Sequence, residues 1–199
     1  DFNRVYCEKA RALKQSELIH LPFVRQKKVV RFWIARLGHL MPPMGRLESF
    51  LAQLSAKQDK NPLLTWGEVS LRRYRDHWYL LQNHSNEPFH IHWQGEKVIP
   101  LSNGAQLEVV QAKGEGLKLA LHDKVEIRNQ VEGLRCKPFN SPHSKPLKKW
   151  WQRFGVPPFK REAWPLIFVN GELAQIPGLF ICDNFALKDP EGIGIHFKI

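Results

Sequence analysis

The sequence has few cysteines, few acidic residues for its length and no long apolar run. Its three cysteines, Cys7, Cys136 and Cys182, are far apart and form no CxxC pair, so neither a disulfide framework nor a cysteine zinc site is predicted. No stretch approaches the roughly 18 apolar residues that a membrane-spanning helix needs, and no signal peptide opens the chain. These absences favour a cytoplasmic protein that does not enter a membrane.

The common signatures of catalytic sites are missing as well. There is no Gly-Lys-Ser phosphate loop, no GxSxG and no HExxH motif, and the acidic residues are too scattered to suggest a carboxylate pair. A Cys–His catalytic arrangement is left open, but no local pattern singles out one cysteine. The residues by themselves therefore predict no active site.

Two histidines, His90 and His92, alternate along one predicted strand and could face a single ion. Only His84 and Glu87 lie nearby in the sequence as a third ligand. Two surface histidines on a strand are the ordinary explanation of this pattern, so no metal site is predicted.

Positive charge is abundant and unevenly spread. The chain has 30 Lys and Arg against 19 Asp and Glu, a net charge of +11. Residues 1–82 have 15 cations against 7 acids, residues 83–130 have 5 against 6, and residues 131–199 have 10 against 6. Such a surplus favours a polyanion, either nucleic acid or an acidic membrane surface, and two basic regions suit a ligand contacted in two places. A basic but unspecialised surface is the alternative.

Residues 1–82 are predicted to form a small helical domain that ends in a β-hairpin. The opening "RVYCEKARAL" is typical of the end of a helix, which suggests a fragment whose N-terminal part has been removed. Two amphipathic helices follow in "LPFVRQKKVVRFWIARLGHL" and "MPPMGRLESFLAQLSAK", and the short Pro-rich turn between them predicts a helical hairpin. Their predicted buried faces are Val30, Trp33, Ile34 and Leu37, then Leu47, Phe50, Leu51 and Leu54. Asp76-His77 is the predicted turn of the β-hairpin.

The rest of the chain is predicted to be rich in strands, which gives an α+β fold class overall. Residues 83–130 form a β-rich connector or the first part of the C-terminal region, and residues 131–199 form a small basic α+β domain. The predicted strands of the middle segment are "PFHIHW", "KVIPL", "QLEVV", "LKLAL" and "KVEIRN". Further on, "PLIFV-NG-ELAQI" predicts a hairpin, because Asn-Gly suits both left-handed positions of a type I′ turn. The segments "GLFICD" and "GIGIHFKI" add further strands.

The stretch "KPLKKWWQRFGVPPFKREAWP", residues 145–165, places six Lys or Arg among three Trp and two Phe. A helix is predicted from about residue 145 to 154, ended by Gly155 and Pro157-Pro158. Its predicted buried stripe is Leu147, Trp150, Trp151 and Phe154, and its opposite face is Lys148, Lys149, Gln152 and Arg153. A solvated helix face usually mixes charges of both signs, yet no acid occurs between Glu132 and Glu162. This uncompensated charge favours contact with phosphates, with a merely basic face as the alternative.

The same stretch, with the strand and hairpin after it, resembles the C-terminal domain of bacterial tRNA(Ile)-lysidine synthetases. The family pattern is KK-x-W/F-Q-x-x-x-V-P-P-W/F, followed by Arg, by Pro before an apolar strand, and by a glycine-bearing hairpin. The matching residues are Lys148, Lys149, Trp151, Gln152, Val156, Pro157, Pro158, Phe159, Arg161, Pro165 and Gly171. "VRFWIARLGHLMPPMGRLESFLAQL" and "LRRYRDHWYLL" are similar to the family's central substrate-binding domain, whereas residues 83–130 are weakly matched.

The resemblance implies a place in tRNA modification. The family activates the C2 position of the wobble cytosine by adenylation with ATP, in the isoleucine tRNA that has a CAU anticodon. The lysine ε-amino group then displaces AMP to give lysidine. The family's catalytic domain, with its SGGxDS loop, precedes the regions matched here, and no such motif occurs in residues 1–199. We therefore expect the tRNA-binding part of an ATP-dependent carbon–nitrogen ligase, inactive by itself, with ATP, Mg²⁺ and lysine bound in the absent domain.

The resemblance also gives the basic residues a role, since the C-terminal domain is expected to meet the acceptor stem and the central domain to help hold the tRNA. The C-terminal candidates are Lys145, Lys148, Lys149, Arg153, Lys160 and Arg161, with Arg135 and Lys137 as loop support. The weaker candidates in the first domain are Arg25, Lys27, Lys28, Arg31, Arg72, Arg73 and Arg75. Alternation along a strand places Arg72 and Arg73 on opposite faces, so not all of them can contact one ligand.

Two other functions remain as alternatives. One is an interaction module that docks acidic proteins or anionic membranes. The other is a self-contained enzyme with an unrecognised site. Whether the chain forms a homodimer is left open by the sequence.

Overall fold

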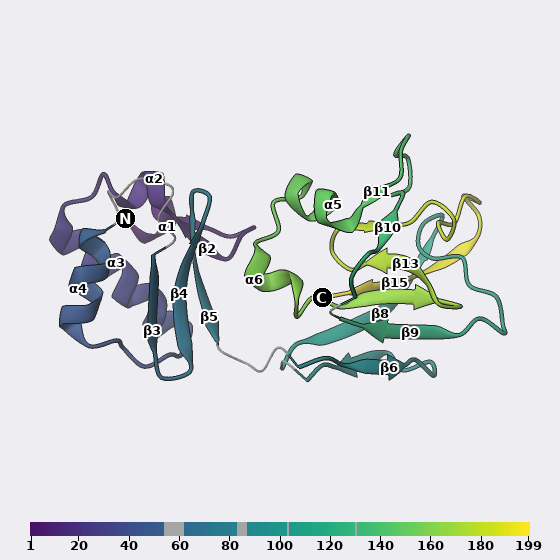
Figure 1. Cartoon of the computed structure of the whole chain (residues 1–199), viewed down its shortest axis with the longest axis horizontal. Coiled ribbons are helices and arrows are strands. Elements are labelled where there is room, and N and C mark those ends of the chain that lie inside the picture. The colour runs from purple at the N-terminus through teal and green to yellow at the C-terminus, as the bar shows by residue number, and fades with distance from the viewer. Residues whose placement is uncertain (54–61, 83–86, 103, 130) are drawn as a thin grey trace. The chain divides into compact units, whose positions relative to one another are not determined.

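Helices and antiparallel sheets make up the protein, whose structure is a computed structural model (Figure 1). It describes residues 1–53, 62–82, 87–102, 104–129 and 131–199. The chain divides into two compact units, over residues 1–84 and 85–199. The predicted α+β fold class is confirmed. Among the described residues, no helix has the length and apolar character needed to cross a membrane.

The first unit packs helices against a five-stranded antiparallel sheet of order β1-β2-β5-β4-β3 (Figure 1). Its elements are α1 (Phe2–Val5), β1 (Tyr6–Cys7), β2 (Ala12–Lys14), α2 (Gln15–Leu18), α3 (Phe23–Arg36), α4 (Met44–Ala52), β3 (Leu63–Trp66), β4 (Val69–Tyr74) and β5 (His77–Gln82). One core holds the unit together, and it contains side chains from both long helices and from the sheet, such as Trp33, Phe50 and Trp78. The edge-to-face contact of Phe50 with Trp78 joins α4 to β5.

Helices α3 and α4 are the two amphipathic helices that the sequence predicts. Val30, Trp33 and Ile34 are buried as expected, but Leu37 is 45% exposed. Leu37 is the C-cap residue of α3, with ψ of 4°, so it lies beyond the last helical turn and its side chain leaves the buried face. In α4 the predicted inward residues Leu47, Phe50 and Leu51 are buried, whereas Leu54 lies outside the described residues.

Two expectations for the first unit are wrong in detail. The helix predicted at the start of the chain ends at Val5, after which β1 pairs with β2 as an antiparallel hairpin. The turn between β4 and β5 consists of Arg75 and Asp76, because His77 already pairs with Tyr74. Arg75 has a left-handed backbone, with φ of 53°. The Asp76 carboxylate accepts hydrogen bonds from the Ser16 backbone N–H and hydroxyl, which ties this turn to α2.

The second unit contains the remaining strands and two short helices. Its elements are β6 (His90–His92), β7 (Val98–Pro100), β8 (Gln106–Lys113), β9 (Val125–Arg128), β10 (Arg135–Cys136), β11 (Lys145–Pro146), α5 (Leu147–Arg153), α6 (Pro158–Arg161), β12 (Leu166–Val169), β13 (Glu172–Ile176), β14 (Phe180–Ile181) and β15 (Ile193–Lys198). A five-stranded sheet has the order β14-β13-β12-β9-β6, a three-stranded sheet β15-β8-β7, and β10 pairs with β11. The middle segment of the chain therefore shares its sheets with the C-terminal segment.

The five-stranded sheet separates two cores, because alternate residues of each strand point to opposite faces. On β12, Ile167 and Val169 belong to the core that also includes Phe197 of the three-stranded sheet. Leu166 and Phe168, from the same strand, belong to the core that α5 covers. Helix α5 and the three-stranded sheet thus lie on opposite sides of one sheet.

The predicted strands of the second unit are found with one exception. The segment "LKLAL" forms only isolated bridges at Leu117, and Leu121 is fully in solvent at 93% exposure. The Asn-Gly hairpin is confirmed, since Asn170 and Gly171 have φ of 51° and 85° between β12 and β13. The Asn170 side chain also donates to the Asp123 carboxylate at 2.7 Å, which fixes the turn to the loop before β9.

Candidate nucleic-acid interface

Helix α5 is short, and its apolar side is anchored firmly in the second unit. It begins after Pro146 and ends before Gly155, which has the left-handed φ of 69° that stops a helix. Leu147, Trp150 and Trp151 are buried, as the sequence predicts. The Trp150 indole N–H donates to the Cys136 carbonyl at 3.0 Å, so the ring is held by a hydrogen bond as well as by packing.

Phe154 departs from the predicted buried stripe. It is 43% exposed and, like Leu37 of α3, it is the C-cap residue of its helix. Its ring stacks on Phe180 with a centroid distance of 5.5 Å. Phe154 therefore covers the edge of the core rather than filling it.

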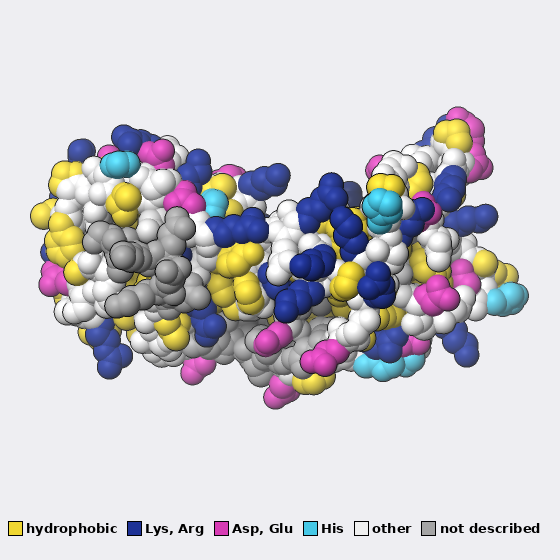
Figure 2. Space-filling model, turned by 45° about the horizontal axis from the view of Figure 1, so that its top comes forward, with side chains coloured by type: hydrophobic (Ala, Val, Ile, Leu, Met, Phe, Trp, Pro, Cys, Tyr) yellow, Lys and Arg dark blue, Asp and Glu magenta, His cyan; other side chains and the backbone are white. Residues whose placement is uncertain are grey.

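The opposite side of α5 is positively charged. Lys148, Lys149 and Arg153 are exposed, and within the described part of the chain none of them forms an ion pair with a carboxylate. Figure 2 shows Lys and Arg side chains gathered over α5 and α6. Because the buried Trp150 and Trp151 anchor α5 in the core, the backbone that carries these charged side chains is fixed in position. We call Lys148, Lys149 and Arg153 the α5 basic face.

Two cations lie against Trp150 at the margin of this face. The Lys145 ammonium is 5.4 Å from the ring centroid, and the Arg153 guanidinium is 5.5 Å from it. Such cation–π contacts restrict the positions of the charged groups without neutralising them. Cations and large rings therefore occur together in this stretch because the Trp150 ring is part of the core and its π surface orients two of the charges.

The remaining C-terminal candidates are already engaged in the fold to different degrees. Arg161 donates from Nε and Nη2 to the Val156 carbonyl, at 3.0 and 2.7 Å, and so fastens α6 to the end of α5. Lys160 is half-buried on α6. Arg135 is exposed and donates to the Ser144 carbonyl at 3.4 Å, which ties together the two ends of the loop between β10 and β11.

Lys137 has its charge compensated. Its ammonium lies 3.1 Å from the Asp183 carboxylate, and this hydrogen bond is the main reason that the pKa of Asp183 is below its ordinary value. Lys188 lies 3.8 Å from the same carboxylate. Of the eight C-terminal candidates, Lys137 is therefore the poorest source of net positive charge.

Three of the first-unit candidates are already engaged by other residues of that unit. Arg25 pairs with Asp1 at 3.0 Å, and Lys27 pairs with Glu48 at 2.7 Å, which links α3 to α4. Arg73 is only 5% exposed and lies on the core side of β4, over Trp78. It donates to the Gln15 side chain at 3.3 Å, so its role is structural.

Four other candidates of the first unit retain some access to solvent. Lys28 and Arg75 are exposed, and Arg75 lies over the Tyr74 ring. Arg31 and Arg72 are half-buried. The expected opposition of Arg72 and Arg73 on β4 is confirmed by their burial.

Sequence reasoning missed a residue near the two alternating histidines. Of the two suggested third ligands, His84 lies outside the described residues, and no described contact joins Glu87 to the two histidines. The carboxylate beside them is that of Glu126 on β9, 34 positions further along the chain than His92. Only the strand register could have revealed it.

Comparisons with known proteins agree with the two-unit structure. The family model described as "TilS substrate binding domain" matches residues 13–79, and that described as "TilS substrate C-terminal domain" matches residues 125–197. The first match lies in the first unit and the second in the unit that carries the α5 basic face.

Among the proteins similar to this chain are tRNA(Ile)-lysidine synthases from two bacteria. A tRNA(Ile)-lysidine synthase of Shewanella woodyi is 33% identical over 189 residues, and one of Coxiella burnetii is 31% identical over 189 residues. These alignments cover 87% and 89% of this chain but 40% and 42% of the relatives, so the chain spans less than half of their length.

A solved structure entitled "Crystal structure of TILS C-terminal domain" aligns with a TM-score of 0.46 and 16% identity. It covers 56% of this chain and 95% of that structure. Together the two family models match residues 13–79 and 125–197 in the family's order, so the chain belongs to the TilS family and carries its substrate-binding and substrate C-terminal domains.

Proposed function

We propose that this chain is the tRNA-holding part of a tRNA(Ile)-lysidine synthase, the class of ligase named in its relatives. The observation that supports this most is the α5 basic face. Its three cations lie on one helix, whose apolar side is buried, and none has a carboxylate partner among the described residues. This helix belongs to the domain that matches the TilS C-terminal model. A surface of this kind suits an anionic ligand with closely spaced charges.

A folded RNA fits these charges better than a single small anion. Paired RNA is recognised mainly through phosphates, 2′-hydroxyls and shape, because its deep major groove hides the base edges. Lys148 and Lys149 supply point charges, and the Arg153 guanidinium can form a planar fork with a phosphate. Contacts of this type position an RNA without reading its sequence. We assign the acceptor stem as their target.

The chemical step is assigned to the part of the protein outside this chain. In the proposed reaction, ATP adenylates the C2 position of the wobble cytosine, in the isoleucine tRNA with a CAU anticodon, and pyrophosphate is released. The lysine ε-amino group then attacks C2 and displaces AMP. No SGGxDS motif occurs in residues 1–199, and we assign no ATP-, Mg²⁺- or lysine-binding residue to this chain. The full protein would carry out this reaction in the cytoplasm.

The test compares three anionic ligands at equal concentration of charge. The purified chain is titrated with isoleucine tRNA, with vesicles of anionic phospholipid, and with an acidic polypeptide, and its intrinsic Trp fluorescence or the anisotropy of a labelled ligand is followed. We expect preference for tRNA. Preference for vesicles or for the polypeptide would contradict the proposal and favour a docking module.

A second measurement separates the holding role from catalysis. With ATP, lysine and tRNA present, the chain alone should give no lysine transfer and no ATP–pyrophosphate exchange. Either activity from the chain alone would show that it is a self-contained enzyme.

A further inference from the structure

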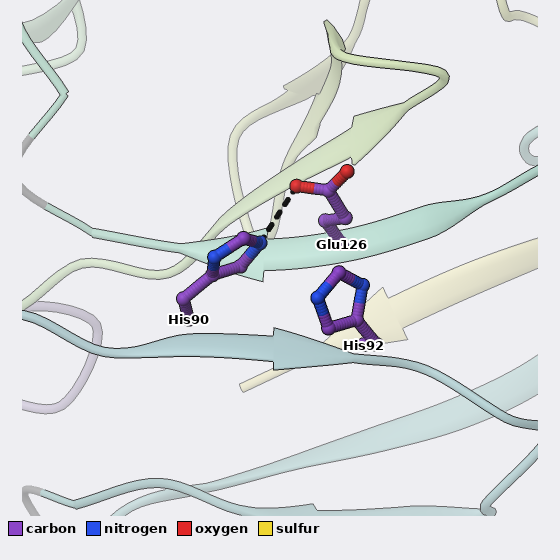
Figure 3. Close-up of side chains that lie close together, drawn as sticks. All are labelled: His90, His92 and Glu126. Carbon is purple, nitrogen blue, oxygen red and sulfur yellow. Dashed lines mark hydrogen bonds and ion pairs between the residues drawn. The ribbon is translucent and has the colours of Figure 1, made fainter.

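A group of metal-ligating side chains lies at the edge of the five-stranded sheet, on strands β6 and β9. His90 and His92 are two residues apart on β6, so both point to the same face. The register pairs His92 with Glu126 and His90 with Arg128, which places the Glu126 carboxylate beside both rings. Figure 3 shows the two imidazoles and the carboxylate turned toward one another across the two strands.

The distances suit a small cation. Ligand atoms of the three residues all lie within 4.8 Å of one another, and the imidazole ring centroids are 4.6 Å apart. A tetrahedral zinc ion with bonds of about 2.0–2.2 Å holds its ligand atoms roughly 3.4 Å apart. Modest side-chain rotations would bring the three groups to that spacing. The hydrogen bond between His90 Nε2 and Glu126 Oε2, now 2.7 Å, would be replaced by two bonds to the ion.

The ligand chemistry also selects the class of ion. Two imidazole nitrogens and one carboxylate oxygen suit Zn²⁺ and other late first-row divalent ions, and they suit Ca²⁺ and Mg²⁺ poorly. Both histidines are exposed, so water can occupy a fourth position. The guanidinium of Arg128 lies 3.4 Å from the same Glu126 oxygen and over the Phe168 ring. Its positive charge opposes the ion, so binding should be weaker than at a buried site with four protein ligands.

We propose that His90, His92 and Glu126 form a Zn²⁺ site that clips the edge strand β6 to β9. Strand β6 has only three residues and, among the described strands, pairs only with β9, so its attachment has few backbone hydrogen bonds. An ion held by both strands adds a link across this weak edge. The site is separate from the α5 basic face, which is built from α5 alone.

The experiment uses the full chain with any affinity tag removed, because a histidine tag would bind zinc itself. Zinc is titrated against a chromogenic indicator, and thermal unfolding is followed with and without excess zinc. We expect one zinc per chain and a higher melting temperature in excess zinc, because an ion that binds the folded state stabilises it. No zinc binding by the chain would overturn the proposal.

Variants assign the ligands. His90→Ala/His92→Ala should lower the zinc affinity by more than about tenfold, because loss of even outer-sphere partners costs about 10–100-fold at metal sites. His122→Ala and Cys7→Ser, which remove an exposed imidazole and a half-buried thiol elsewhere, should bind zinc as the unchanged chain does. Equal affinity of the double variant and the unchanged chain would refute the assignment. Should the double variant fail to fold, Glu126→Gln provides the same test with a side chain of the same shape.

Discussion

At the scale of single residues, positive side chains of this protein differ in whether their charge is available. Lys148 and Lys149 are exposed on α5, whereas Lys137 is paired with Asp183 and Arg161 is bound to a backbone carbonyl. Arg73 is buried. Sequence alone places Arg161 with the lysines of α5, and Lys137 beside them as loop support, because the hydrogen-bond partners of both side chains are seen only in the folded structure. Among the C-terminal candidates, the positive charges that remain most available to a ligand are therefore those of the α5 basic face and of Lys145 beside it.

The first prediction concerns these two lysines. Lys148→Glu/Lys149→Glu should weaken tRNA binding by more than about tenfold at low salt, because two phosphate contacts become repulsive. Unfolding by urea should be almost unchanged, since both side chains are exposed. The comparison variant is Lys97→Glu/Lys118→Glu, which makes the same change of net charge at exposed positions outside α5. An equal loss in the two variants would mean that binding follows net charge alone.

A second prediction at this scale is a dependence of stability on pH. The Asp123 carboxylate accepts hydrogen bonds from the Ala120 N–H and, second in effect, from the Asn170 side chain, both at 2.7 Å. These bonds hold the pKa of Asp123 below its ordinary value. Because the folded pKa is the lower one, the stabilisation is present above the unfolded pKa of about 3.9 and is lost as pH falls toward the folded pKa.

Asp123→Asn should therefore be less stable than the unchanged chain at neutral pH, and the difference should shrink below about pH 4. Urea unfolding at several pH values measures it. Glu172→Gln, at an exposed position of the β12–β13 hairpin that contains Asn170, is the control for the loss of a carboxylate from this region. A difference that persists unaltered at low pH would show that the ionised carboxylate is not its source.

At the scale of elements, helix α5 has a structural side and a binding side. Trp151 is 6% exposed and packs against Trp164 with a centroid distance of 5.7 Å. Trp151→Ala should lower the free energy of unfolding of the second unit by roughly 3–5 kcal/mol, as for other large buried rings. Phe154→Ala, in the same helix but 43% exposed, should cost less, roughly 1–2 kcal/mol. Denaturant unfolding measures both.

One result would contradict the assignment of Trp151 to the core. A Trp151→Ala protein that unfolds like the unchanged chain, and that has lost only its RNA binding, would make Trp151 a stacking platform for bases. The apolar side of α5, and not its basic face, would then be the side that contacts the ligand.

The elements also show what sequence can predict. Periodicity finds α3, α4 and α5, and the Asn-Gly signal finds the β12–β13 hairpin, because those patterns are local. Leu37 and Phe154 are misplaced for the same reason: each occupies the i+7 position of its stripe, but the helix ends one residue earlier. The start of the chain is misjudged because β1 and β2 are too short to show alternation.

Candidate sites are predictable to the extent that their residues are close in sequence. The cations of α5 fall within six positions, so the pattern exposes them directly. Glu126 cannot be connected with His90 and His92 in this way, because the register that joins β6 to β9 is a property of the folded sheet. The same limit applies to the pairing of Lys137 with Asp183.

At the scale of the whole molecule, the two units differ in how they hold their positive charge. In the first unit, Arg25 and Lys27 are paired with acids and Arg73 is buried. In the second, Lys148, Lys149 and Arg153 have no carboxylate partner among the described residues. We therefore expect the α5 basic face to make the most direct phosphate contacts. The first unit, with 15 cations against 7 acids over residues 1–82, should add longer-range attraction and weaker contacts through residues such as Lys28 and Arg75.

The salt dependence of tRNA binding by the chain is the decisive measurement of whether the α5 basic face holds the RNA. Each phosphate that a cation neutralises releases counterions, so three such contacts should weaken binding by about 40-fold between about 50 and 200 mM salt, taking the slope for a duplex. Lys148→Glu/Lys149→Glu should show a clearly shallower slope over the same range. An affinity that hardly changes with salt, or a slope that the double variant shares with the unchanged chain, would contradict a role of this face in holding the RNA.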